Sequence, residues 1–424
     1  MISVPFEKHV LPNGLELILH QDRSLPVVAI NVWYHVGSKN EKPGRTGFAH
    51  LFEHVMFEGS KHHNRSYFEP LQKIGANLNG STNPDRTNYW ENVPSNYLEL
   101  ALWLESDRMG YLLDALDQQR FDVQRDVVKN ERRQSYENRP YGMAHLLLQP
   151  EVFPLPHPYN WPTIGSQEDL DSAKLEDIKD FFRTFYSPSN ASIAIAGDID
   201  LDQALQLVEK YFGDLTPAAP IAKMQPIASG LAGVKVLSTE DDVQLERRYV
   251  VWPSPPAFDE WEPALDVLST VLADGKGSRL YRHLVHDTEM ARDVAAFAYS
   301  QELSGEFFIQ ATTSKGEETA RVSDAIAHEI ATIKKTPPTN EEMERARNQI
   351  ETHFVRTLER TGGFGGRADQ LNYFNVLAGD PALVTTYPDR YKTVTAEQVS
   401  EAASQFLGER RVELTVSPKE KSGE

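Results

Sequence analysis

The stretch Gly47–Phe57 constrains this chain more than any other, because two histidines flank a glutamate in the order His-x-x-Glu-His. On a helix, residues three and four positions apart share one face, so His50, Glu53 and His54 all point in the same direction. Two imidazoles four residues apart can hold one zinc ion, and a carboxylate beside them can accept a proton from water at the metal. The stretch therefore predicts a zinc helix of the inverted type.

The residues around this stretch favour a helix. Pro43 and Gly44 end the preceding segment, and Thr46 is placed to cap the helix. Gly59 is a natural end. The apolar side chains that can pack inward are Leu51, Val55 and Met56. The alternative is that two histidines and a glutamate share a solvated helix face by chance. A zinc site also needs a third protein ligand, which the rest of the chain must supply.

Size and composition predict several domains and no disulfides. A chain of 424 residues is too long for one small core, so we expect two or more domains. It contains no cysteine, which rules out disulfide bonds, thiol nucleophiles and cysteine–zinc sites. No stretch approaches the roughly 18 apolar residues of a membrane span, and no signal peptide is visible. We therefore expect a cytoplasmic or periplasmic protein with no membrane partner, and we prefer the cytoplasm.

The net charge of −19 argues against nucleic acid as a partner, because phosphate binding requires clustered lysine and arginine. An acidic surface is compatible with a cationic substrate, such as a basic peptide, that is steered by the field of the protein. The alternative is that the acidic residues serve solubility alone.

The first half of the chain predicts a mixed α and β domain. Two strands are expected within residues 7–36, with a hairpin turn at Asn13-Gly14. Residues 76–82 and 86–93 also predict strands, and the first of them is polar and contains a glycine, which favours the edge of a sheet. An exposed edge is where a peptide can add as an extra strand. Helices are expected at 64–79, 95–114, 119–138, 173–186 and 201–212, and a further strand at 191–197.

The second half repeats this order of elements. Residues 217–232 are rich in proline, alanine and glycine and predict a linker. We therefore expect an N-terminal domain at 1–216 and a homologous C-terminal domain at 233–424. The expected strands are 233–252, 292–300, 306–313 and 412–416, and the expected helices are 261–273, 317–334, 339–360 and 395–406. The pattern predicts a duplicated α+β domain.

Several motifs together resemble the pitrilysin family of inverted zinc peptidases, which includes insulin-degrading enzyme and the mitochondrial processing peptidase. They are His50–His54, Gly75–Thr82, Thr87–Tyr89, Val127–Glu131 and Gly277–Leu280. The resemblance covers nearly the whole chain. It implies two homologous domains, each an antiparallel-rich sheet backed by helices, of which the N-terminal domain is catalytic and the C-terminal domain is not.

The resemblance also implies the site. The third zinc ligand of the family is a glutamate 75–80 residues after the second histidine, and Glu131 lies at that distance from His54. By resemblance, His50, His54 and Glu131 bind Zn²⁺ and Glu53 is the catalytic base. Two nitrogens and one carboxylate leave a fourth position for water. Otherwise, Glu131 is a surface charge in a helix rich in glutamate and arginine.

The resemblance assigns substrate binding to the backbone of the polar edge strand. Asn79 aligns with an asparagine on that strand, where the backbone at Asn79, Gly80 and Ser81 pairs with the bound peptide. The alternative is that Asn79 serves a turn.

The sequence departs from the family at two places. Gln124 stands where many members have a second glutamate seven residues before the ligand, so the hydrogen bonding that supports the zinc site can differ. Members that work alone also carry an arginine and a tyrosine seven residues apart, and here those positions hold Val285 and Arg292. This pattern resembles two-subunit members and predicts a heterodimer with a homologous, zinc-free partner that closes around a peptide chamber. A homodimer is the alternative.

Two functions remain open. The first is a zinc endopeptidase, a hydrolase acting on unfolded peptides or small proteins, and the intact His50, Glu53, His54 and Glu131 favour it. The second is a non-catalytic scaffold or processing-type subunit of the same fold. The run Gly362–Gly366 superficially resembles a phosphate loop, but it follows a helix and lacks the Lys-Ser/Thr ending, so a flexible connector is favoured.

Overall fold

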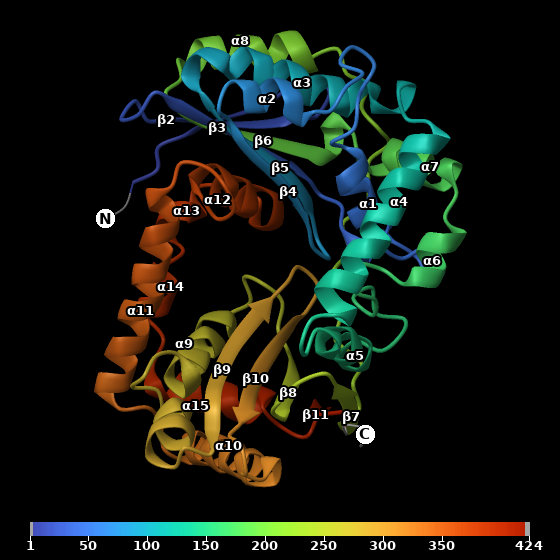
Figure 1. The fold of residues 1–424 in the computed structure, drawn as a ribbon. Helices are drawn as coiled ribbons and strands as arrows, with labels where there is room; N and C mark the ends of the chain where they lie inside the picture. The colour runs from blue at the N-terminus through green and yellow to red at the C-terminus, as the bar shows by residue number, and fades with distance from the viewer. Residues whose placement is uncertain (1–2, 420–424) are drawn as a thin grey trace. The chain divides into compact units, whose positions relative to one another are not determined.

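The computed structural model describes residues 3–419, which form two compact units (Figure 1). Within residues 3–419, unit 1 comprises the described part of Met1–Glu131, Pro162–Lys223 and Phe354–Tyr387, and unit 2 comprises Arg132–Trp161, Met224–His353 and the described part of Pro388–Glu424. Each half of the sequence therefore contributes one segment to the unit built mainly from the other half. Residues 217–232 contain no helix or strand. The division into homologous halves at that segment stays a prediction.

Unit 1 is built on a six-stranded sheet with the order β1-β2-β6-β3-β5-β4. All neighbours pair antiparallel except β2 and β6, which are parallel. The predicted hairpin at Asn13-Gly14 joins β1 and β2, and Gly14 supplies the positive φ of +87° that its turn requires. The strands are β1 (Glu7–Val10), β2 (Glu16–Gln21), β3 (Val27–Tyr34), β4 (Asn77–Thr82), β5 (Thr87–Pro94) and β6 (Ala191–Gly197).

The two faces of this sheet differ in character. On β3, the apolar side chains alternate with Asn31 and Trp33, which point to the opposite face. There Trp33 Nε1 donates a 2.8 Å hydrogen bond to Asp369 Oδ1 on α12, a segment 336 residues away in the chain. The helices of unit 1 are α1 (Phe48–Val55), α2 (Phe68–Lys73), α3 (Leu98–Tyr111), α4 (Gln118–Arg132), α6 (Gln167–Ser172), α7 (Leu175–Phe185), α8 (Leu201–Phe212), α12 (Arg367–Tyr373) and α13 (Leu383–Thr386).

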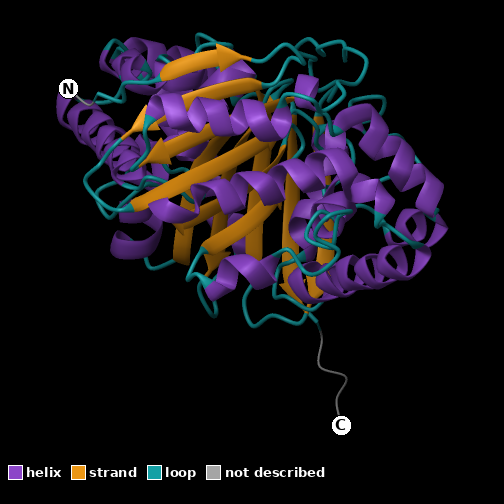
Figure 2. Cartoon of the chain, turned by 90° about the horizontal axis from the view of Figure 1, so that it is seen from above, coloured by secondary structure: helices purple, strands orange, loops and turns teal. Residues whose placement is uncertain are grey.

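Unit 2 contains a five-stranded sheet with the order β7-β11-β8-β10-β9. Only β7 and β11 pair in parallel, so the topology is that of unit 1 without β1. Helices flank strands in the molecule as a whole (Figure 2). The elements are β7 (Val234–Asp241), β8 (Arg247–Ser254), β9 (Ala291–Ser300), β10 (Gly305–Thr313), β11 (Arg411–Pro418), α5 (Met143–Val152), α9 (Glu262–Ala273), α10 (Thr319–Lys335), α11 (Asn340–Glu359, which ends in unit 1), α14 (Asp389–Lys392) and α15 (Ala396–Phe406).

The predicted α+β class, with two antiparallel-rich sheets backed by helices, is confirmed. Three details differ. The helix expected at 64–79 is limited to α2, at Phe68–Lys73. Helix α5 was not predicted because Pro150 interrupts its sequence, although the structure accommodates this proline inside the helix. The helices α12, α13 and α14 were also not predicted, whereas the helix expected at 395–406 corresponds to α15 at Ala396–Phe406. Within residues 3–419, no helix combines the length and apolar character needed to cross a bilayer.

Candidate metal centre

Helix α1 begins at Phe48, and the preceding residue, Gly47, adopts a left-handed φ of +85°. The carboxylate of Glu41 accepts hydrogen bonds from the free amides of Gly47 and Ala49, at 2.9 and 2.8 Å. The prediction that Thr46 caps this helix is therefore wrong: its hydroxyl donates to Asp169 Oδ2 at 2.6 Å. A carboxylate satisfies the amides of the first turn and interacts favourably with the positive end of the helix dipole.

The apolar face of α1 fixes the direction of its histidines. Leu51, Phe52 and Val55 are fully buried, and the Phe52 ring packs 4.4 Å from that of Tyr186, measured between ring centroids. His50 and His54 lie on the other side and are partly exposed. The predicted inward packing of Leu51, Val55 and Met56 is thus borne out, and it leaves both imidazoles available to a ligand.

Helix α4 brings Glu131 to the two histidines. Glu131 Oε2 lies 3.8 Å from His50 Nε2 and 3.2 Å from His54 Nε2. One ligand atom from each of the three residues lies within 4.8 Å of the others, and in the described part of the chain this is the single group of three or more such residues that could hold a metal ion. Ligands about 2.0–2.2 Å from a tetrahedral zinc ion lie roughly 3.3 Å apart, so the donor set fits that ion.

The protonation states of these side chains also suit metal binding. Burial, and then the neighbouring His54, lower the pKa of His50 to about 4, so its imidazole is neutral at pH 7. A hydrogen bond with His54 lowers the pKa of Glu131, which keeps that carboxylate ionised. Neutral imidazoles and a carboxylate are the forms in which these side chains bind Zn²⁺.

Glu53 lies on the same helix but is not a member of this group. Its side chain is buried, which raises the pKa of the carboxyl. Thr82 Oγ1, on β4, donates a 2.6 Å hydrogen bond to Glu53 Oε2. A Cβ atom added at Gly80 would lie 3.2 Å from Glu53 Cγ, so the backbone of β4 passes close to this carboxyl.

Strand β4 is the edge of its sheet, as predicted. Asn79, Gly80 and Ser81 pair on one side with residues of β5, and no strand of the described chain pairs with their other side. The Asn79 side chain is exposed, whereas that of Ser81 donates a 2.6 Å hydrogen bond to Asn88 Oδ1. The structure therefore brings the expected substrate strand and the expected base together.

The sequence profile of the insulinase family (peptidase family M16) matches residues 17–150, and that of the peptidase M16 inactive domain matches residues 172–350. The chain belongs to the insulinase family. The matched regions lie on either side of residues 151–171, which contain the connection between α5 and α6.

Named relatives of this insulinase-family chain cover it almost completely. The zinc protease PqqE of Helicobacter pylori is 29% identical over 95% of this chain and 90% of that protein. The crystal structure of a protease from Helicobacter pylori has a TM-score of 0.90 at 25% identity and covers 98% of this chain and 100% of that one. The periplasmic protease PqqL of Escherichia coli shares the fold, with a TM-score of 0.78 at 17% identity over 99% of this chain and 48% of that one.

The structure places the three residues at which the sequence is expected to depart from the family pattern as follows. Gln124 Nε2 donates a 2.6 Å hydrogen bond to Glu58 Oε1. Val285 is half-buried in the π-helical segment Tyr281–Asp287 of unit 2, and Arg292 is exposed near the start of β9. Sequence reasoning missed Thr82 and Glu41. For Thr82 a signal was present, because Gly80 and Thr82 are two residues apart on the strand and therefore share one face.

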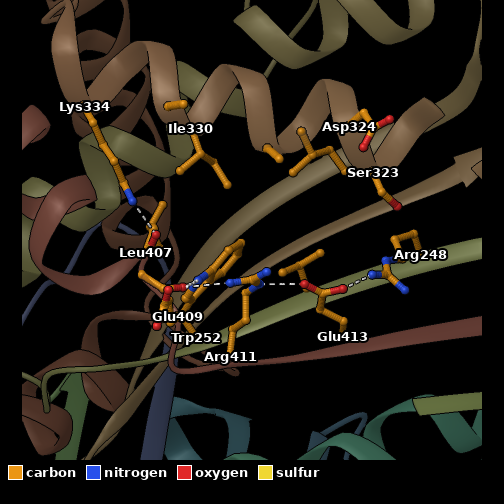
Figure 3. A pocket seen from close by; sticks show the side chains of 15 residues that line it. Arg248, Trp252, Ser323, Asp324, Ile330, Lys334, Leu407, Glu409, Arg411 and Glu413 are labelled. Carbon is orange, nitrogen blue, oxygen red and sulfur yellow. Dashed lines mark hydrogen bonds and ion pairs between the residues drawn. The ribbon is translucent and has the colours of Figure 1, made fainter. Parts of the chain in front are cut away.

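A cavity of about 460 Å³ lies in unit 2 between α10 and the strands β8 and β11 (Figure 3). Three of its charged side chains bind one another: Glu413 forms ion pairs with Arg248 and Arg411. Lys334 donates a 2.6 Å hydrogen bond to the carbonyl of Leu407. Since these charges are already paired, the cavity is not the better candidate for a functional site.

Proposed function

We propose that this chain is a zinc-dependent endopeptidase that hydrolyses peptide bonds in unfolded peptides or small proteins. The observation that carries the proposal is the cluster of His50, His54 and Glu131 donor atoms within 4.8 Å, with the buried Glu53 carboxyl on the same helix. The name of the Helicobacter pylori relative, zinc protease PqqE, supports zinc as the metal.

In this proposal His50, His54 and Glu131 hold the zinc ion, and Glu53 moves the proton. Bound zinc supplies a Lewis acid that acidifies water and polarises the carbonyl of the scissile peptide bond. The Glu53 carboxylate accepts a proton from the attacking water and later delivers it to the leaving nitrogen. Because burial raises the pKa of Glu53, the group is suited to both transfers near neutral pH.

The substrate adds to the free edge of β4 as an extra strand. Its backbone pairs with Asn79, Gly80 and Ser81, which presents a peptide bond to the adjacent Glu53. The exposed Asn79 side chain and the close approach of Gly80 to Glu53 support this assignment. Gln124 supports the site indirectly, through its hydrogen bond to Glu58.

A homologous, zinc-free partner supplies the arginine and tyrosine that this chain lacks at Val285 and Arg292, and the pair encloses a peptide chamber. The likeness to the PqqL structure, of which this chain covers 48%, supports an assembly of two such chains. A homodimer is the alternative assembly. We place the protein in the cytoplasm or periplasm.

A non-catalytic scaffold is the second candidate. The match of residues 172–350 to the M16 inactive domain favours it for unit 2, whose helix α9 contains no histidine. The complete donor set of unit 1 favours the enzyme for the chain as a whole.

Cleavage of a quenched fluorescent peptide carrying basic residues tests the proposal. The zinc-loaded chain should cleave the peptide, and a chelator should stop it. Glu53→Gln should retain zinc while kcat falls by about 10²- to 10⁴-fold. Glu69→Gln, on the exposed face of α2, is the matched control and should change neither quantity. Failure of the wild-type chain to bind zinc would overturn the proposal. Zinc binding without cleavage, both alone and with a homologous chain, would establish the scaffold.

A further inference from the structure

The carboxyl of Glu53 is tethered from the edge of the sheet. Thr82 is the last residue of β4, and its Oγ1 donates to Glu53 Oε2 at 2.6 Å. The two residues lie 29 positions apart in the chain, on different elements. A hydrogen bond to a buried carboxylate is short and strong, so it restricts the rotation of that carboxylate.

The surroundings direct the Thr82 proton to Glu53. A threonine hydroxyl has one proton to donate. Thr82 Oγ1 also lies 3.4 Å from Thr87 Oγ1, but that is a long contact. The proton of Thr87 goes to the Val36 carbonyl at 2.9 Å. The shorter contact, to Glu53, is therefore the hydrogen bond that Thr82 makes.

Gly80 completes the hold on this side chain. Residues 80 and 82 are two apart on a strand, so they face the same side of the sheet. A Cβ atom at Gly80 would lie 3.2 Å from Glu53 Cγ, so there is little free space beside the stem of the side chain. The hydrogen bond from Thr82 goes to Oε2, which leaves Oε1 as the oxygen that can face a reacting water.

We infer that Thr82 is a positioning residue: its hydroxyl orients the Glu53 carboxylate, and it does so from the strand on which the peptide is expected to bind. Ordering of β4 by a bound peptide then orders the base. The inference rests on the proposed peptidase function, and it assigns to that reaction a residue outside the group of His50, His54 and Glu131.

A purely structural Thr82 would affect folding alone, so the test separates orientation from folding. Thr82→Val keeps the shape and removes the hydroxyl, whereas Thr82→Ser keeps the hydroxyl. We expect Thr82→Val to lower kcat by about 10- to 100-fold with KM within about twofold, and Thr82→Ser to retain kcat within about threefold. Zinc content should not change. Thr239→Val, on the edge strand β7 of unit 2, is the matched control and should change nothing.

Two results would overturn the inference: full activity in Thr82→Val, or equal losses in Thr82→Val and Thr82→Ser. If Thr82→Val does not fold, Thr82→Ala takes its place in the test. A measurement that does not depend on peptide cleavage tests the inference independently of the proposed function. In the metal-free protein, the Tm shifts of Thr82→Val and Glu53→Gln should be non-additive in the double variant. Additive shifts would show that the hydrogen bond between Thr82 and Glu53 is absent. Non-additive shifts, in a protein whose wild type shows no cleavage, would support the hydrogen bond and overturn the proposed peptidase function.

Discussion

The two sheets share one topology but carry different helices before their edge strands. In each sheet a parallel pair, β2–β6 or β7–β11, is followed by antiparallel neighbours up to a free edge, β4 or β9. Helix α1 precedes β4 and presents two histidines and a glutamate. Helix α9 precedes β9, is almost wholly buried, and contains no histidine. A fold alone therefore does not determine chemistry, which depends on a few side chains of one helix.

Two buried carboxyls, Glu53 in unit 1 and Glu306 in unit 2, differ in their hydrogen bonding. In unit 1, Glu53 receives a hydrogen bond from Thr82. In unit 2, Glu306 on β10 is 2% exposed, and its Oε1 has no hydrogen-bond partner among the described residues. Burial raises the pKa of Glu306 to about 8 and that of Asp266 on α9 to about 7. We therefore expect the units to differ in their responses to metal and to pH.

Removal of one histidine should have the largest effect, and that effect should be confined to unit 1. His54→Ala leaves two of the three donors, so we expect loss of zinc and at least a 10³-fold fall in kcat/KM, on the scale of removing essential catalytic groups. In the wild type, zinc at 100 times its Kd should stabilise the folded state by about 2.7 kcal/mol. Hydrogen exchange with and without chelator should show this protection in α1 but not in β10.

His328→Ala, at an exposed position on α10, is the control for the histidine change and should keep zinc and activity. Equal zinc protection of both units would contradict the expectation that the metal acts on unit 1 alone.

Glu306→Gln should stabilise unit 2 at high pH. Because the folded-state pKa of about 8 lies above the ordinary value of 4.5, the folded state holds the proton longer than the unfolded state. Stability contributed by the neutral carboxyl is therefore lost as the pH rises between these values. Each unit of pKa difference is worth about 1.4 kcal/mol, so the gain at pH 8 should reach a few kcal/mol and vanish near pH 4.5. Urea unfolding at both pH values measures it.

Glu413→Gln is the contrasting control in the same sheet. Glu413 forms ion pairs with Arg248 and Arg411, and both of its partners would lose a charge-assisted hydrogen bond. This variant should destabilise unit 2 at pH 8. A destabilised Glu306→Gln at that pH would show that Glu306 has a partner that the structure does not reveal.

His50 should give unit 1 the opposite pH response. Burial lowers its pKa to about 4 from an ordinary 6.5, so between these values the unfolded state binds the extra proton. Stability of the metal-free protein should then fall as the pH drops from 6.5 towards 4, by at most about 3 kcal/mol for this group. His50→Gln should flatten that part of the profile. Unfolding followed by hydrogen exchange in α1 at pH 4.5, 5.5 and 6.5 measures this stability. An unchanged slope of stability against pH in His50→Gln would contradict the assignment of that slope to His50.

Short-range patterns predicted the elements that carry the site. The histidine spacing predicted the shared face of α1, and the polar, glycine-containing strand predicted the edge position of β4. These predictions succeed because helix and strand periods are local properties of the chain. The candidate ligand Glu131 came from a resemblance that spans most of the chain, because no local pattern relates it to His54.

The contacts that were not predicted join distant segments. Nothing near Thr46 shows that Glu41 caps α1 instead, since both residues are suitable acceptors and only the path of the loop decides between them. The packing of Asp369 against Trp33 crosses 336 residues. The bond between Thr82 and Glu53 likewise depends on how α1 meets β4, which sequence periodicity does not specify.

Gly80→Ala should lower activity less than the other changes, and it sharpens the comparison between the edge strands β4 and β9. The new Cβ would lie 3.1 Å from both Phe57 Cε2 and Tyr89 Cδ1 and 3.2 Å from Glu53 Cγ, so these neighbours must move by a few tenths of an ångström. We expect kcat to fall by about threefold, roughly 0.7 kcal/mol in the barrier, with little change in KM. Steady-state kinetics on the fluorescent peptide measures this.

Gly233→Ala is the control for the alanine change, because a Cβ atom there meets nothing within 4 Å. The edge strand β9 already carries Ala295, Ala296 and Phe297, which shows that side chains are accommodated on an edge that borders no catalytic base. If Gly80→Ala lowered kcat more than tenfold while Thr82→Val did not, the steric contact of β4, and not its hydroxyl, would hold Glu53 in place. If instead Thr82→Val lowered kcat more than tenfold and Gly80→Ala did not, the hydrogen bond would be what orients Glu53. Displacement of the Glu53 side chain by the new methyl group would then be tolerated.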